Sequence, residues 1–152
     1  MNLELAKLSI FIITIIVLIY KLFFHNSKIK NEHLFIVSSI LVTLILIIVI
    51  YLKLHHFLRS EFNISNTITY LIISIPFLYH FYKFRYNILN SSYIFLIISL
   101  LFIGFKLLLD LLTDPKILVL SHSDYIEEIL RIAGTFFWML YYIFYSFRIR
   151  KD

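Results

Sequence analysis

Residues 34–54 read LFIVSSILVTLILIIVIYLKL and carry a single charged side chain, Lys53. The hydrocarbon core of a bilayer is about 30 Å thick, so an α-helix needs about 20 apolar residues to cross it. Within hydrocarbon, only α-helices and closed barrels pair all of their backbone amides and carbonyls. The run therefore predicts a helix that crosses a membrane.

Four further apolar runs reach or approach the length needed for the same role. The predicted transmembrane helices are residues 8–24, 34–54, 67–82, 92–109 and 126–147. The run at 67–82 is the shortest, and it contains Pro76, which removes a backbone hydrogen bond and kinks a helix. The sequence predicts an all-α polytopic integral membrane helix bundle, a single domain over residues 1–152. It has five transmembrane helices, or four if the Pro76 segment is re-entrant.

The composition favours a membrane protein and excludes several kinds of site. Of the 152 residues, 61% are hydrophobic, against about 45–50% in average soluble domains. The mean hydropathy is +0.92. Because the chain has no cysteine, disulfides and thiolate metal sites are excluded, and its two glycines cannot form a glycine-rich phosphate loop. No polar segment between the apolar runs is long enough for a soluble domain.

Basic residues flank the predicted helices unevenly, and the positive-inside rule turns this bias into an orientation. With five helices, the more basic side holds Lys21, Lys28, Lys30, Lys83, Arg85, Arg148, Arg150 and Lys151. The rule predicts a multi-pass protein of the plasma (cell inner) membrane, with the N-terminus outside and the C-terminus in the cytoplasm. Because such cations contact anionic headgroups, the net charge of +5 requires no nucleic-acid partner, and we expect none.

The last predicted helix begins with charged residues, within SHSDYIEEILRIAGTFFW at positions 121–138. Asp124 and Glu127 have the spacing of a capping box, in which each side chain accepts a hydrogen bond from the other residue's backbone amide. Acidic groups also suit the positive end of the helix dipole. Neither effect explains Arg131, which lies two turns inside the helix.

A polar and aromatic stripe follows one face of this helix at intervals of three or four residues. Its members are Glu128, Arg131, Thr135, Trp138, Tyr142 and Tyr145. Gly134 lies beside the stripe and allows a neighbouring helix to approach closely. We expect this face to turn away from lipid.

The preceding helix supplies a matching face. Ser92, Ser99 and Lys106 recur every seven residues, and Asp110 lies one turn beyond Lys106. Consecutive helices with a short connection pack as antiparallel neighbours, so the charged residues of both are expected at similar depth on the outer side. The predicted site comprises Lys106, Asp110, Glu127, Glu128, Arg131, Thr135 and Trp138.

Two interpretations of this site remain open. In the first, the charged residues fasten the helical hairpin by pairing, which offsets the cost of placing charge near hydrocarbon. In the second, they line a hydrated pocket that binds a ligand, an ion or a partner, because ionisable groups inside membranes commonly mark functional sites.

The histidines predict neither a metal centre nor covalent catalysis. The best metal candidate combines His55 or His56 with His122 and Asp124, but these positions match no zinc signature. The histidines, His80 included, are expected at the interface, hydrogen-bonded to water and headgroups. The serines beside His122 and Asp124 are neighbours in sequence, which is not the spatial convergence of a catalytic triad. The sequence predicts no cofactor and no catalytic residue.

These observations predict a small non-enzymatic membrane protein that binds a partner protein, a lipid or a small ligand at the outer mouth of its last two helices. The expected partners are the lipid bilayer and either another membrane protein or a second copy of the chain. The alternative is a transporter or channel subunit for a small solute or ion, which requires a continuous polar route across the bilayer. An enzyme acting on lipid would need a convergent acid, base or metal, which the sequence does not assemble.

Overall fold

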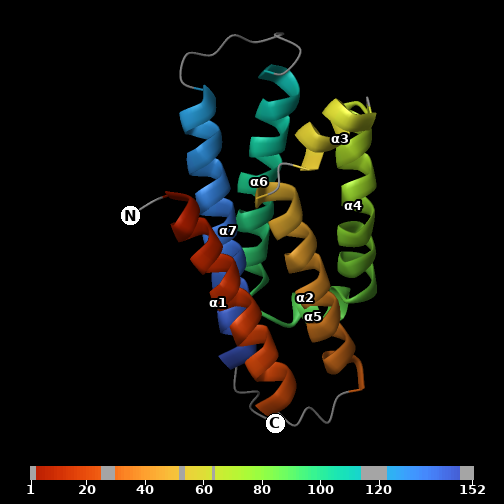
Figure 1. The fold of residues 1–152 in the computed structure, drawn as a ribbon. Helices are drawn as coiled ribbons and strands as arrows, with labels where there is room; N and C mark the ends of the chain where they lie inside the picture. Colours follow the sequence, from red (N-terminus) through yellow and green to blue (C-terminus); the bar gives the residue numbers. More distant parts are fainter. Residues whose placement is uncertain (1–2, 25–29, 52–53, 63, 114–122, 148–152) are drawn as a thin grey trace. The chain divides into compact units, whose positions relative to one another are not determined.

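A computed structural model describes residues 3–24, 30–51, 54–62, 64–113 and 123–147, and these residues form helices and short turns without a strand (Figure 1). The all-α prediction is confirmed for this part of the chain. The helices are α1 (Leu3–Phe24), α2 (Lys30–Tyr51), α3 (Leu54–Phe62), α4 (Asn66–Lys83), α5 (Arg85–Leu89), α6 (Tyr93–Thr113) and α7 (Ser123–Phe147).

The five predicted apolar runs correspond to α1, α2, α4, α6 and α7, whereas the short helices α3 and α5 were not predicted. The run at 34–54 was predicted as one helix, but α2 ends at Tyr51 and Leu54 already belongs to α3. Among the described residues, two helices are long and apolar enough to cross a membrane, Asn31–Ile50 and Tyr125–Phe147. Leu8–Phe24 and Tyr93–Leu109 are shorter apolar helices, and α4 belongs to neither group.

The chain divides into two compact units. The first contains Met1–Val17 and Ser91–Asp152, and the second contains Leu18–Asn90. Helix α1 contributes to both units, because the boundary falls at residues 17 and 18.

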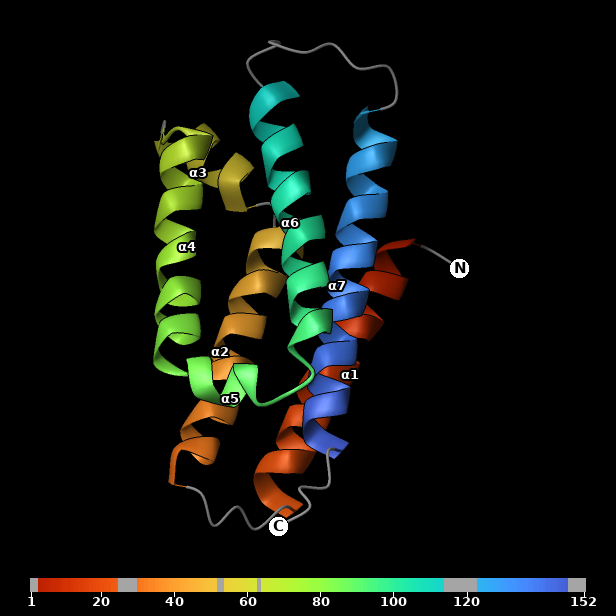
Figure 2. The same cartoon turned by 180° about the vertical axis from the view of Figure 1, so that it is seen from behind.

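In the first unit, α6 and α7 lie side by side and run in opposite directions (Figures 1 and 2). Stacked rings set the register: Phe95 stacks on Phe144 with ring centroids 4.9 Å apart, and Phe102 stacks on Phe137 at 5.8 Å. The helices approach closely at Gly134, where an added Cβ would lie 2.7 Å from Ile103 Cγ1. The predicted close approach at this glycine is therefore confirmed.

In the second unit, α2 packs against α3 and α4. Helix α4 begins after Ser65, whose side chain accepts a hydrogen bond from the Ile68 amide at 3.3 Å, as expected for an N-cap serine. Phe84 separates α4 from α5, and its amide donates to the His80 carbonyl at 3.0 Å. Because the Phe84 side chain is also buried, this residue anchors the end of α4. Figure 2 shows α4 passing into α5.

Candidate functional site

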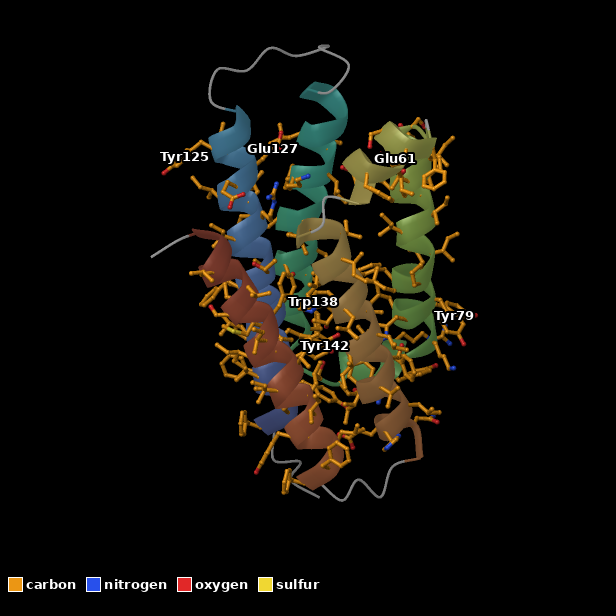
Figure 3. All side chains as sticks on the ribbon, viewed as in Figure 1. Glu61, Tyr79, Tyr125, Glu127, Trp138 and Tyr142 are labelled. Carbon is orange, nitrogen blue, oxygen red and sulfur yellow. The ribbon has the colours of Figure 1, made fainter. Side chains whose placement is uncertain are left out.

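The polar and aromatic stripe of α7 points inward, as predicted. Thr135, Trp138 and Tyr142 are completely buried, and Tyr145 is nearly so. Figure 3 labels Trp138 and Tyr142, which follow one another along α7 with ring centroids 5.4 Å apart. Their spacing of one helical turn places both rings on the same buried face.

At the other end of the stripe, Arg131 forms an ion pair with Glu128. Arg131 Nη1 lies 3.1 Å from Glu128 Oε2, and the two side chains are only 17% and 20% exposed. The pair joins positions three apart on α7, so it stabilises the start of that helix. The sequence predicted mutual pairing among Lys106, Asp110, Glu127, Glu128 and Arg131, and any pair with Asp110 lies outside the described side chains.

Lys106 brings a second cation to this level of the hairpin. Its side chain lies on α6 and is 9% exposed. Ile103 on α6 lies against Gly134 on α7. The two helices are antiparallel, so a step of one turn forward along α6 matches a step of one turn back along α7. Lys106 therefore lies at about the same level as Arg131. Lys106, Glu127, Glu128 and Arg131 form what we call the charged level, whose formal charges cancel.

The predicted site divides into separate groups along α7. Glu127 lies near the beginning of the helix and Trp138 is further along it, eleven positions or about 16 Å away (Figure 3). Thr135 does not join the charged level, because its hydroxyl donates to the Ile132 carbonyl at 3.0 Å. Asp110 lies on α6, but its side chain is outside the described residues, as is that of Asp124 in the predicted capping box.

Two hydrogen bonds join α7 to this part of the chain, one from a residue just before α6 and one from a residue within α6. Ser99 Oγ donates to the Gly134 carbonyl at 2.7 Å, and Ser91 Oγ lies 3.1 Å from Tyr141 Oη. Ser99 was predicted on the interhelical face, but Ser91 was missed in favour of Ser92. Helical periodicity does not apply to Ser91 or Ser92, because both precede α6, which begins at Tyr93.

The second unit contains a polar contact that the sequence interpretation missed. His80 on α4 is 1% exposed, and its Nδ1 lies 2.8 Å from Ser38 Oγ on α2. The imidazole also stacks on Phe35, with ring centroids 5.3 Å apart. The prediction that His80 lies at the interface with water was wrong, because α4 turns this residue toward α2. The sequence offered one indication of this contact: Ser38 and His80 are polar residues within two apolar helices.

The side chains that the structure describes include no group of three or more His, Asp or Glu able to hold a metal ion. The metal candidate from the sequence, His55 or His56 with His122 and Asp124, lies outside those side chains. The charged level instead places two cations and two carboxylates on the α6–α7 hairpin, where Glu128 and Arg131 pair with each other. No protein-family model matches the chain, and searches of curated proteins and of solved structures find no match.

Proposed function

We propose that this protein crosses the plasma membrane with α1, α2, α4, α6 and α7. Its N-terminus lies outside and its C-terminus lies in the cytoplasm. It is not an enzyme, and it acts by binding a partner protein, a lipid or a small ligand at the charged level of the α6–α7 hairpin.

Exposed apolar side chains support the proposed membrane location. Large apolar patches on a water-soluble monomer are rare, whereas lipid covers such side chains in a membrane protein. The helices α1, α4 and α6 are shorter or less apolar than a full span, yet they also expose large apolar side chains. These include Ile12, Ile13, Ile16 and Ile19 on α1, Ile68, Leu71, Ile72, Ile75 and Leu78 on α4, and Ile94, Ile97, Leu101, Phe105 and Leu108 on α6. This distribution supports membrane crossing by more helices than length and hydropathy alone select.

The observation that carries the binding proposal is the low exposure of charge beside an apolar helix pair. Lys106 is 9% exposed, and the Glu128–Arg131 pair is at most 20% exposed. Charged groups at membrane depth are costly and usually serve a function, so this level is the favoured place for a ligand. A ligand with both a positive and a negative group would meet complementary charges there.

A photo-crosslinking amino acid at Glu127, introduced into the full chain in its native membrane, tests the binding proposal. Phe136 is an exposed position on the same helix and provides the control site. We expect a discrete adduct at position 127 that is absent at 136 and that Arg131→Gln reduces at least severalfold at equal amounts of folded protein.

A purely structural role for the charged level gives a different result. In that case Arg131→Gln lowers the midpoint of unfolding in mild detergent and leaves the crosslinking pattern unchanged. That outcome, or equal adducts at positions 127 and 136, would refute the binding proposal. A reporter fused after Asp152 tests the orientation independently, because the proposed topology requires its activity in the cytoplasm.

Transport of a small solute or ion is the second candidate, and its support is weaker. A transport route would use the buried hydroxyls along α6 and α7. The hydroxyls of Ser91, Ser99 and Thr135 are instead engaged in hydrogen bonds of 3.1, 2.7 and 3.0 Å. Flux into liposomes containing the protein, abolished by Arg131→Ala, would favour transport over binding.

A further inference from the structure

Helix α4 carries a continuous exposed apolar row. Ile68, Leu71, Ile72, Ile75 and Leu78 are each more than half exposed and recur at helical spacing. The row spans ten positions, from Ile68 to Leu78, or about 15 Å along the helix axis. This length matches one leaflet of a hydrocarbon core about 30 Å thick.

The apolar row ends in a group of aromatic and basic side chains, which we call the α4–α5 corner. Its members are Tyr79, Tyr82, Lys83, Arg85 and Tyr86, and all of them are exposed. Along α4 the exposed surface therefore changes from aliphatic to tyrosine and then to cationic. The same order of polarity runs from the acyl chains of a bilayer through its interface to the phosphate groups.

The tyrosines of the corner hold its cations in place without neutralising them. Lys83 Nζ donates to Tyr79 Oη at 3.0 Å and lies 5.2 Å from the centroid of the same ring. The Arg85 guanidinium lies 5.5 Å from the Tyr82 ring centroid and 5.0 Å from that of Tyr86. Cation–π contacts orient a cation while its charge remains available to an anion.

Carboxylates are absent from the sequence around the corner. Residues 62–109 contain no Asp or Glu, and the unit Leu18–Asn90 contains only Glu32 and Glu61. Glu32 is buried beside Lys21, with 3.7 Å between Glu32 Oε1 and Lys21 Nζ. Glu61 lies near the opposite end of α4 from Tyr79 (Figure 3). The corner therefore presents positive charge without an acidic side chain to balance it in its own unit.

We propose that the α4–α5 corner is a binding site for an anionic phospholipid. The headgroup phosphate contacts Lys83 and Arg85, with the tyrosine hydroxyls as further donors, and the acyl chains lie along the apolar row of α4. Arginine suits this role because its planar guanidinium donates two parallel hydrogen bonds to a phosphate. The inference rests on the proposed membrane location and is independent of any ligand at the charged level of α6–α7.

Lipid binding by the full chain in a neutral detergent tests this inference. Fluorescent phosphatidylglycerol is titrated with protein, and unlabelled phosphatidylglycerol, phosphatidylcholine or inorganic phosphate is added as competitor. We expect phosphatidylglycerol to compete at least tenfold better than phosphatidylcholine, and inorganic phosphate to compete negligibly because it lacks the acyl chains. The affinity should fall as salt is raised, because the attraction is between exposed charges.

The double substitution Lys83→Gln with Arg85→Gln should weaken binding by about 25-fold, since each cation near an anionic surface contributes about fivefold. Lys53→Gln with Arg59→Gln removes the same charge from another segment and should change affinity less than threefold. Both substituted corner residues are exposed, so helicity by circular dichroism should be unchanged. The Arg131→Gln variant should bind the lipid as tightly as the unsubstituted protein, whether or not the charged level binds a ligand.

Several results would overturn the lipid site. Equal competition by phosphatidylcholine would show that headgroup charge is not recognised, and competition by inorganic phosphate would point to a site for the free anion. Competition by polyglutamate would identify an acidic protein as the partner instead. Equal losses in the two double variants would show that net charge alone drives binding.

Discussion

Replacing Gly134 by alanine is expected to destabilise the α6–α7 hairpin by about 2 kcal/mol. The added Cβ would lie 2.7 Å from Ile103 Cγ1, 3.3 Å from Ile103 N and 3.4 Å from Phe102 Cβ. Carbon atoms in favourable contact are about 3.5–4.0 Å apart. Because one of the close atoms belongs to the backbone, rotation of the Ile103 side chain cannot relieve the whole overlap, and α6 must move away from α7.

Three effects contribute to this magnitude. Overpacking in a close-packed interior costs about 1–3 kcal/mol. Separating the helices also weakens the 2.7 Å hydrogen bond from Ser99 Oγ to the Gly134 carbonyl, at a cost of about 1 kcal/mol. Alanine is about 1 kcal/mol more favourable than glycine in a helix interior, which offsets the hydrogen bond. The overpacking cost of about 2 kcal/mol therefore remains.

The measurement is the free energy of unfolding of the full chain in mild detergent, followed by circular dichroism during titration with a denaturing detergent. Gly104→Ala is the matched control, because, apart from its chain neighbours and the backbone of its own helix, no atom lies within 4 Å of its added Cβ. This control should be neutral or stabilised by up to about 1 kcal/mol. Ile103→Ala should rescue part of the loss in the double variant. Equal stability of the two alanine variants would refute the assigned helix contact.

Three further substitutions test contacts within the two units by the same titration. Ser99→Ala should cost about 1 kcal/mol through loss of its hydrogen bond to Gly134, and no change would show that this bond is not formed. Trp138→Ala should cost about 3–5 kcal/mol, because the indole is completely buried, and a cost below about 1 kcal/mol would place it at the surface. Ser38→Ala should cost about 1–3 kcal/mol, because it leaves the buried His80 Nδ1 without its 2.8 Å contact. Ser74→Ala, whose hydroxyl bonds only to Leu71 of its own helix, is the control for Ser38 and should change stability by less than about 0.5 kcal/mol.

The α6–α7 hairpin could largely be predicted from helical periodicity. Thr135, Trp138 and Tyr142 share one face of any regular helix, and polar and aromatic groups on one side of an apolar helix favour an inward orientation. Gly134 was predicted to permit close approach because it lacks a Cβ, and Ile103 occupies the space that a Cβ would fill. These predictions depend only on the geometry of a single helix and on residue size.

The sequence could not predict which charged residues pair with one another. Glu128 and Arg131 were assigned to a common site with Lys106, and among the described side chains Arg131 forms an ion pair with Glu128 of its own helix, three positions away. Which of several nearby carboxylates an arginine meets depends on side-chain rotamers and on the axial offset between helices. Periodicity specifies the face of a helix and leaves that offset open.

Contacts between distant segments were the least accessible to sequence reasoning. Ser38 and His80 are 42 positions apart, and nothing in either helix alone indicates that the other faces it. The turn through Phe84 and the short helix α5 were likewise missed, because five residues are too few to show a helical period.

Apolar periodicity and run length alone predicted an all-α chain and the approximate positions of α1, α2, α4, α6 and α7, because each depends on interactions between residues close in sequence. The same local signals identified the inward face of α7. The tertiary structure alone revealed that Ile103 lies against Gly134, that Ser38 meets His80 and that aliphatic, aromatic and cationic groups follow one another along exposed α4. These features depend on the register and rotation of packed helices, which close packing of complementary side chains selects and no single helix encodes.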